Sequence, residues 1–133
     1  MKEAVKFLQE NITGYLATVE GGKPKVRPFQ FMLEDSGKLY FCTANTKDVY
    51  HQLKANPFVE FSSSSPNFTW IRLNGEAKFS SDLAIKEKIL DVSPLVKSIY
   101  QTADNPIFEA FYIDHGTAII ADFSGQPPKK IEF

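Results

Sequence analysis

The chain has 133 residues, of which 43% are hydrophobic and 23% are charged, and its formal net charge is −1. This size predicts one domain spanning residues 1–133, and the near-neutral charge argues against nucleic acid or a membrane surface as a partner. A single cysteine excludes an intramolecular disulfide and a cysteine-based zinc cluster, and the charged, amphipathic N-terminal segment does not have the pattern of a signal peptide, so a cytoplasmic location is expected.

The spacing of apolar residues and turn formers predicts a strand-rich first half. The elements expected there are a helix at residues 3–10, strands at 14–19, 26–33 and 39–43, a helix opened by the corner 44–47, and a strand at 58–61. Asn56 and Pro57 are expected to end that second helix, because a proline disfavours helical conformation in the residue before it.

The second half predicts one long strand, two short helices and two further strands. The elements expected there are a polar loop at 62–67, a strand at 68–79, helices at 82–90 and 93–100, strands at 107–113 and 117–123, and a tail at 129–133. A structural role is expected for His115, in a turn or bulge between the last two strands. Six or seven strands with few helices in one small domain predict a mainly β fold, a closed or nearly closed antiparallel barrel.

Residues 26–43 are predicted to form a hairpin around the turn at 34–38. The pairs expected from that turn are Leu33 with Leu39, Phe31 with Phe41, and Phe29 with Thr43. Continuing this register places Arg27 near Asn45, beside the corner that opens the helix. Thr46 or Asn45 is expected to cap that helix with its side chain.

The corner at 44–47 combines groups that suit an anion such as a phosphate. The helix N-terminus offers backbone N–H groups and a partial positive charge. Arg27 would add a bidentate fork, Lys47 a mobile point charge, and Thr43 and Thr46 hydroxyl donors. The same pattern is also typical of an ordinary capped surface helix, so both interpretations stay open at this point.

The strand at 68–79 has two unlike faces. One face is apolar, and the other carries Phe68, Trp70, Arg72, Asn74 and Glu76. An aromatic residue beside an arginine is typical of interfaces and ligand walls, although a solvated face with a half-buried Trp70 fits the same pattern. Only two of the 15 basic residues are arginines, Arg27 and Arg72, which makes both candidates for planar, bidentate contacts. Cys42 lies in an apolar strand and is expected to be a buried small hydrophobe.

Five segments in order resemble one family across nearly the whole chain. They are residues 12–18 (ITGYLAT), 24–28 (PKVRP), 39–47 (LYFCTANTK), 53–57 (LKANP) and 70–77 (WIRLNGEA). Together they resemble the pyridoxamine 5′-phosphate oxidase-like, FMN-binding split-barrel superfamily. The resemblance implies a six- to seven-stranded antiparallel split β-barrel that binds FMN in a groove at a homodimer interface.

The resemblance also implies roles for particular residues. Arg27 and Lys47 would hold the FMN phosphate, assisted by Thr43, Asn45 and Thr46. The remaining candidates are Pro28, Phe29 and Gln30 along the ring edge, Cys42 beside Thr43, and Trp70 and Arg72 from the partner subunit or on the substrate side. FMN would carry out the redox chemistry, so the leading hypothesis is a homodimeric FMN-dependent oxidoreductase that takes a small-molecule substrate, with NADH or NADPH as a candidate electron donor.

The chain departs from true pyridoxamine phosphate oxidases at its end. Residues 126–133 contain no arginine or histidine, whereas such oxidases grip the substrate phosphate with a C-terminal segment that carries both. Vitamin B6 oxidation is therefore not expected, and the chain resembles the small flavin reductase and nitroimidazole-resistance branch. That branch often has a functional histidine near the second strand, which residues 29–32 lack, and His51 is expected to have an exposed polar role.

Three other functions fit parts of the sequence. No catalytic side chain stands out, so a non-catalytic flavin-binding, storage or sensor protein is the main alternative. A heme-binding relative is a weaker one, since only His51 and His115 offer imidazole ligands. An oligonucleotide-binding barrel would use aromatic side chains as stacking platforms, but the net charge and the scarce arginine argue against it.

Overall fold

A computed structural model describes residues 1–133, with eight strands and four short helices. The elements are α1 (Lys2–Glu10), β1 (Thr13–Glu20), β2 (Lys23–Gln30), β3 (Leu33–Asp35), β4 (Lys38–Ala44), α2 (Asp48–Ala55), β5 (Phe58–Ser64), β6 (Trp70–Ser80), α3 (Leu83–Val92), α4 (Pro94–Tyr100), β7 (Phe108–Ala121) and β8 (Lys129–Glu132). None of the helices has the length and apolar character needed to cross a membrane.

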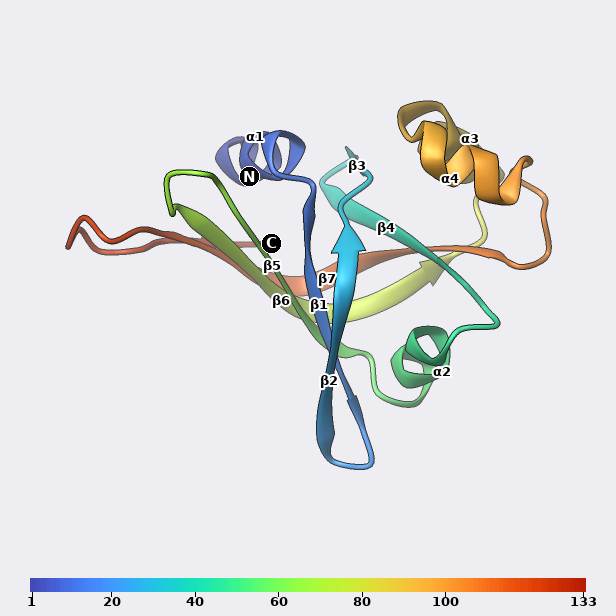
Figure 1. Cartoon of the computed structure of the whole chain (residues 1–133), viewed down its shortest axis with the longest axis horizontal. Helices are drawn as coiled ribbons and strands as arrows, with labels where there is room; N and C mark the ends of the chain where they lie inside the picture. Colours follow the sequence, from blue (N-terminus) through green and yellow to red (C-terminus); the bar gives the residue numbers. More distant parts are fainter.

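All eight strands belong to one antiparallel sheet with the order β2-β1-β5-β6-β7-β4-β3, and β8 pairs with β7 (Figure 1). The two end strands of this order, β2 and β3, are consecutive in the chain. The Phe31 N–H donates to the Ile12 carbonyl at 2.9 Å, and the Met32 N–H donates to the Tyr40 carbonyl at 3.0 Å. These two residues therefore connect both ends of the curled sheet, which confirms the mainly β, split-barrel class. The strand count is eight rather than six or seven.

The predicted hairpin is wrong in two respects. Strand β2 pairs with β1 along its whole length, so Arg27 lies opposite Leu16 and not near Asn45 as a strand partner. Only the short β3 pairs with β4, and Leu33 lies opposite Tyr40, one residue away from the predicted register. The reason is the turn: a two-residue loop, Ser36 and Gly37, has positive φ at both positions (53° and 81°), which is the geometry of a tight hairpin rather than a longer loop.

Three other boundaries differ from the sequence-based expectation. Strand β5 continues to Ser64, so the polar loop begins later than residue 62. The two predicted strands at 107–123 are one strand, β7, with a bulge at residues 114–116 where His115 has φ 48°. The tail at 129–133 forms β8 against β7. Each segment gains backbone hydrogen bonds from a neighbouring strand of the sheet, and local composition does not reveal this pairing.

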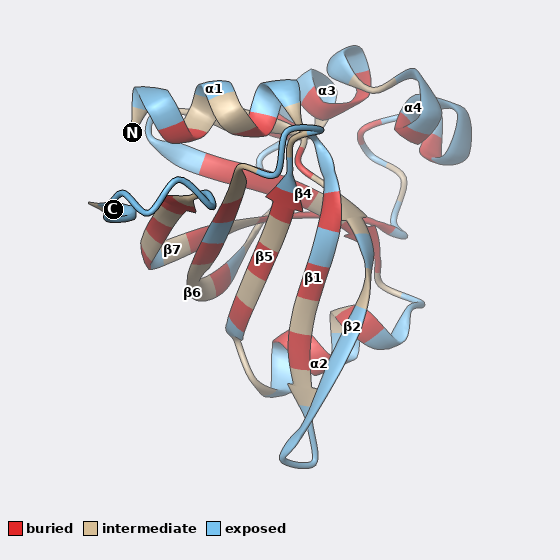
Figure 2. Cartoon of the chain, turned by 60° about the vertical axis from the view of Figure 1, so that its left-hand side comes forward, coloured by how far each residue is buried: buried red, intermediate tan, exposed pale blue.

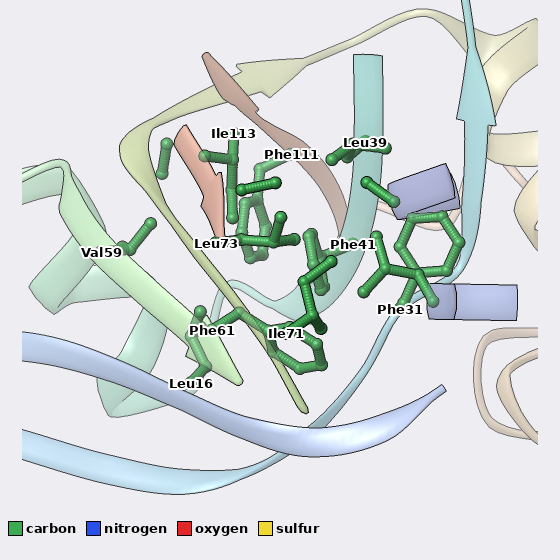
Figure 3. Packing of buried hydrophobic residues seen from close by; sticks show 14 of the residues in the cluster. Leu16, Phe31, Leu39, Phe41, Val59, Phe61, Ile71, Leu73, Phe111 and Ile113 are labelled. Atoms are coloured by element: carbon green, nitrogen blue, oxygen red, sulfur yellow. The ribbon is translucent and has the colours of Figure 1, made fainter. Parts of the chain in front are cut away.

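The barrel interior is packed with phenylalanine. Inward residues alternate along β1 and β5, which gives the banded burial pattern in Figure 2. The Phe41 ring packs on Phe61 and Phe111 with centroids 5.0 and 5.7 Å apart, and Ile71 and Leu73 of β6 complete this centre (Figure 3). Each such side chain contributes about 1.5–3 kcal/mol by leaving water. The apolar face predicted for residues 68–79 is therefore confirmed.

A second, smaller core attaches α3 and α4 to the outside of the barrel. Ile85 and Ile89 of α3 pack with Tyr40 of β4, and the Tyr100 ring of α4 stacks on Phe108 with centroids 4.6 Å apart. Both helices are capped by side chains, since Asp82 and Ser93 accept hydrogen bonds from backbone N–H groups of the first turns. This core fixes α4 beside β4, where a cavity opens.

Candidate functional site

The corner between β4 and α2 leaves the helix N-terminus without a side-chain cap. The N-cap residue is Lys47, and no side chain accepts from the first-turn N–H groups, so the predicted capping by Asn45 or Thr46 is wrong. The Asn45 amide instead donates to the Pro106 carbonyl at 2.7 Å and to the Glu109 carboxylate at 2.9 Å. These contacts with the chain that enters β7 draw Asn45 away from the helix and leave its N-terminus open.

A cavity of about 370 Å³ lies next to this corner, between β2, β4, the start of α2 and helix α4. In Figure 1, α2 and the α3–α4 pair lie on the same side of the molecule, with the end of β4 leading to α2. The cavity is lined by 14 residues: Thr13, Arg27, Pro28, Phe29, Gln30, Met32, Cys42, Thr43, Lys47, Val49, Leu95, Val96, Ile99 and Tyr100. Cationic groups come from the strands and the corner, and α4 supplies a mainly apolar wall.

Arg27 is held by acceptors of the protein itself. Its Nη1 donates to the Leu16 carbonyl at 3.2 Å and to the Thr18 hydroxyl at 2.8 Å, and its Nη2 donates to the Gln52 Oε1 at 2.5 Å. Thr18 and Gln52 are both buried, and they are two of only four buried polar side chains. Burial lowers the pKa of the guanidinium and the nearby Asp48 carboxylate opposes this, but an arginine remains charged in proteins.

Thr43 lacks a hydrogen-bond partner, although its side chain is buried. Only 3% of the residue is exposed, and its hydroxyl and that of Ser63 are the two buried side-chain polar atoms without a partner. Thr43 lines the cavity together with Arg27 and Lys47, whereas Ser63 does not line it. An unpartnered buried hydroxyl costs about 1–3 kcal/mol, which a ligand that accepts a hydrogen bond from it would recover.

The other titratable groups of the cavity are neutral at physiological pH. Burial raises the pKa of the Cys42 thiol to about 12, and burial is also the main cause of the raised pKa of Tyr100. Cys42 is half-buried and packs against the second core beneath α4. Its environment is therefore nearly that of the small buried hydrophobic residue that the sequence predicts. The cavity therefore holds two cations and no carboxylate or thiolate, a composition that suits an anion attached to an apolar group.

The structure brings seven of the predicted cofactor-binding residues into this cavity. They are Arg27, Pro28, Phe29, Gln30, Cys42, Thr43 and Lys47. Asn45 and the exposed Thr46 stay in the adjoining corner and do not line it. Arg27 reaches the cavity although its predicted strand pairing was wrong, because α2 packs against β1 and carries the corner toward β2.

Trp70 and Arg72 lie elsewhere, on the outward face of β6. The Trp70 ring packs on Phe123 with centroids 5.0 Å apart. The Arg72 guanidinium pairs with the Glu60 carboxylate at 2.7 Å, and Tyr15 of β1 is exposed on the same face, two strands away. Neither predicted residue lines the cavity of its own subunit.

Sequence reasoning missed the contribution of α4. Leu95 and Ile99 stand four residues apart on this helix, and each is 60% exposed, while Val96 and Tyr100 anchor the helix on the second core. The apolar pair at helical spacing was visible in the sequence. Its position beside the cavity depends on how α3 and α4 dock on β4 and β7, which no local pattern gives.

Comparisons with known proteins agree with this fold. The sequence model of the pyridoxamine 5′-phosphate oxidase family matches residues 1–121. A crystal structure of a NimC/NimA family protein from Clostridium acetobutylicum is 38% identical, with a TM-score of 0.92 and coverage of 100% of this chain and 92% of that chain. None of the curated protein sequences matches the chain.

Two more distant structures share the fold and differ in their ligands. A heme binding protein from Mycobacterium smegmatis is 17% identical with a TM-score of 0.82, covering 98% of this chain and 56% of that chain. A pyridoxamine 5′-phosphate oxidase-related, FMN binding protein from Nostoc punctiforme is 20% identical with a TM-score of 0.69, covering 96% and 84%. Identities this low establish the shared architecture alone.

Proposed function

Because this chain belongs to the pyridoxamine 5′-phosphate oxidase family, within which it is related to a NimC/NimA family protein, we propose that its cavity binds FMN. The observation that carries the proposal is that Thr43, whose buried hydroxyl has no hydrogen-bond partner, lines a cavity that also has Arg27 and Lys47 in its wall. A phosphate accepts hydrogen bonds from all three side chains.

The chain's own residues divide the binding task. Arg27, Thr43 and Lys47 would hold the phosphate, together with the uncapped N-terminus of α2. The ring would lie along Pro28, Phe29 and Gln30, where main-chain groups can bond its polar edge and the apolar wall of α4 excludes water. The Gln30 amide donates to the Thr13 hydroxyl at 3.0 Å, which fixes this side chain at the cavity edge.

FMN supplies hydride transfer when it is bound, and the side chains of the cavity are not suited to replace it. Cys42 and Tyr100 are held protonated, so neither is a nucleophile or base at neutral pH. We infer an FMN-dependent oxidoreductase of a small-molecule substrate, with NADH or NADPH as candidate donor. The absence of a carboxylate or histidine from the cavity wall also fits a non-catalytic flavin-binding, storage or sensor protein.

Heme is the less suitable ligand for this cavity. The distant mycobacterial relative is a heme binding protein, but neither histidine of this chain lines the cavity. His51 is exposed on α2, and His115 lies in the β7 bulge, where its Nδ1 is 3.0 Å from the Asp114 carboxylate. A cavity with a cationic end, no imidazole, and a thiol and a phenol that burial keeps protonated suits a phosphorylated flavin better than an iron porphyrin that needs an axial ligand.

We further propose that two copies associate through the outward face of β6. Trp70 and Arg72 do not line the cavity of their own subunit, and an aromatic residue and an arginine beside the exposed Tyr15 are the composition of an interface. In a homodimer these side chains would approach the flavin of the partner subunit.

The spectrum of the protein after incubation with FMN and gel filtration tests the function. The proposal expects retained flavin absorbance with saturable binding, and bleaching by NADH or NADPH without oxygen. Retained flavin that neither nucleotide bleaches would favour the storage or sensor role over the oxidoreductase. The absence of retained flavin and of saturable binding would contradict the FMN site itself.

A further inference from the structure

A second hollow adjoins the cavity on the other side of the proposed phosphate site. It measures about 380 Å³ and is lined by Glu20, Lys25, Val26, Arg27, Lys47, Asp48, Val49 and Gln52. Arg27, Lys47 and Val49 line both spaces, so the two cations stand on a shared wall. A phosphate held there has an apolar cavity on one side and a polar hollow on the other.

The strand β2 leads from one space to the other. Phe29, Arg27 and Lys25 alternate onto the same face, and two residues advance a strand by roughly 6.6 Å. Phe29 packs on the core ring of Phe111 at 5.9 Å, Arg27 lies between the two spaces, and Lys25 lies opposite the buried Thr18. Toward the hairpin end, which Figure 2 shows as exposed, the face thus changes from apolar to cationic. Lys25 is placed to meet a second anionic group beyond the one at Arg27.

The hollow also contains acceptors that a lone phosphate would not favour. Asp48 acts electrostatically on Arg27, and the Glu20 carboxylate accepts from the Gln52 amide at 3.3 Å. Carboxylates repel a phosphate monoester, which carries a charge of about −1.5 to −2. They do, however, accept hydrogen bonds from ribose hydroxyls, as in dinucleotide sites. Lys25 with two carboxylates therefore suits a second phosphate followed by a ribose.

We propose that this polar hollow is a subsite for the nucleotidyl half of a flavin dinucleotide, so that the chain binds FAD as well as FMN. The inference rests on the proposed flavin function, because the flavin and its first phosphate would occupy the cavity already described. The second phosphate would contact Lys25, and the ribose hydroxyls would donate to Glu20 or Asp48.

Calorimetric titrations of the flavin-free protein with FMN and with FAD test the subsite. FAD is expected to bind within about tenfold of FMN, and Lys25→Ala is expected to weaken FAD about threefold to fivefold while changing FMN less than about twofold, as for one exposed charge contact. Lys6→Ala, an exposed change on α1, is the matched control and should alter neither affinity.

The possible failures are distinguishable. FMN binding without measurable FAD binding would overturn the subsite and leave the proposed function standing. FAD binding that Lys25→Ala leaves unchanged would place the nucleotidyl half in solvent and also overturn it. If neither flavin binds, both the subsite and the proposed function are wrong.

Discussion

The two arginines of this chain occupy opposite environments. Arg27 is anchored between β1, β2 and α2 by three acceptors and stands at a cavity wall. Arg72 lies on the outward face of β6 with a 49% exposed side chain, and its one partner is the Glu60 carboxylate of the next strand. The rarity of arginine singled out both residues equally, whereas their surroundings separate an organised binding group from a surface ion pair.

This difference has an energetic meaning. A surface ion pair contributes about 0–1 kcal/mol, because water and salt screen it. The contacts of Arg27 involve the buried Thr18 and Gln52, which also hydrogen-bond to each other, so the guanidinium is part of a buried polar network. Arg27 therefore supports the fold as well as the proposed phosphate site, and only a comparison of variants can separate these roles.

Replacing Arg27 by alanine should have the largest effect. We expect Arg27→Ala to lower the free energy of unfolding by about 2–4 kcal/mol, because Thr18, Gln52 and the Leu16 carbonyl lose a shared donor. Arg72→Ala, the matched control, should cost at most about 1 kcal/mol. Urea denaturation monitored by tryptophan fluorescence measures both values. Equal losses in the two variants would abolish the distinction between the arginines.

Lys47→Ala separates binding from folding more cleanly than Arg27→Ala. Lys47 is exposed and makes no ion pair, so the variant should fold normally, yet we expect FMN affinity to fall by about 1–3 kcal/mol through loss of a charge-assisted contact. Fluorescence quenching of FMN on titration measures this change, with Lys6→Ala as the control. An unchanged dissociation constant would remove Lys47 from the phosphate site.

Trp70→Ala examines the outward face that carries Arg72. If this face pairs two copies, truncation of the half-buried ring should weaken the dimer by about 1–2 kcal/mol, as for an aromatic interface residue. Sedimentation velocity at decreasing protein concentration should then show dissociation of the variant before the wild type. Identical profiles, or a wild type that is monomeric at every concentration, would contradict the interface.

Cys42→Ala should have the smallest effect, and the size of that effect should change at alkaline pH. The folded state keeps the thiol protonated up to a pKa of about 12, whereas the unfolded chain ionises near 9, so the wild type binds more protons when folded between these values. Its stability should therefore decline as pH rises above 9, by about 1.4 kcal/mol at pH 10 through this group. The difference in stability between wild type and Cys42→Ala, followed from pH 7 to 10, should shrink accordingly, and a constant difference would refute the buried-thiol account.

Local patterns predicted the class of the fold and most of its elements, because alternation and helix caps are encoded over a few residues. They failed in two ways. The register of Leu33 depends on the exact type of turn at Ser36 and Gly37, which composition alone does not give. The pairing of β8 with β7 and the contacts of Asn45 with Pro106 and Glu109 depend on how the chain packs in three dimensions.

The candidate site likewise has a part that local sequence predicts and a part that depends on tertiary packing. The cationic and hydroxyl residues were predictable from their chemistry at one corner. The apolar wall depends on the docking of α4, and the hold of Thr18 and Gln52 on Arg27 depends on the packing of α2 against β1. Residue spacing predicts neither arrangement, because both arise from contacts between elements far apart in sequence.

The buried hydroxyl of Thr43 has no hydrogen-bond partner in the protein, and the proposed function assigns it the FMN phosphate as its acceptor. Thr43→Val removes this hydroxyl at nearly constant volume, and Ser63→Ala removes the other unpartnered buried hydroxyl, which lies outside the cavity. We predict that both variants raise the melting temperature of the flavin-free protein, and that only Thr43→Val weakens FMN, by about fivefold to tenfold. An FMN dissociation constant unchanged by Thr43→Val, or weakened equally by Ser63→Ala, would contradict the account.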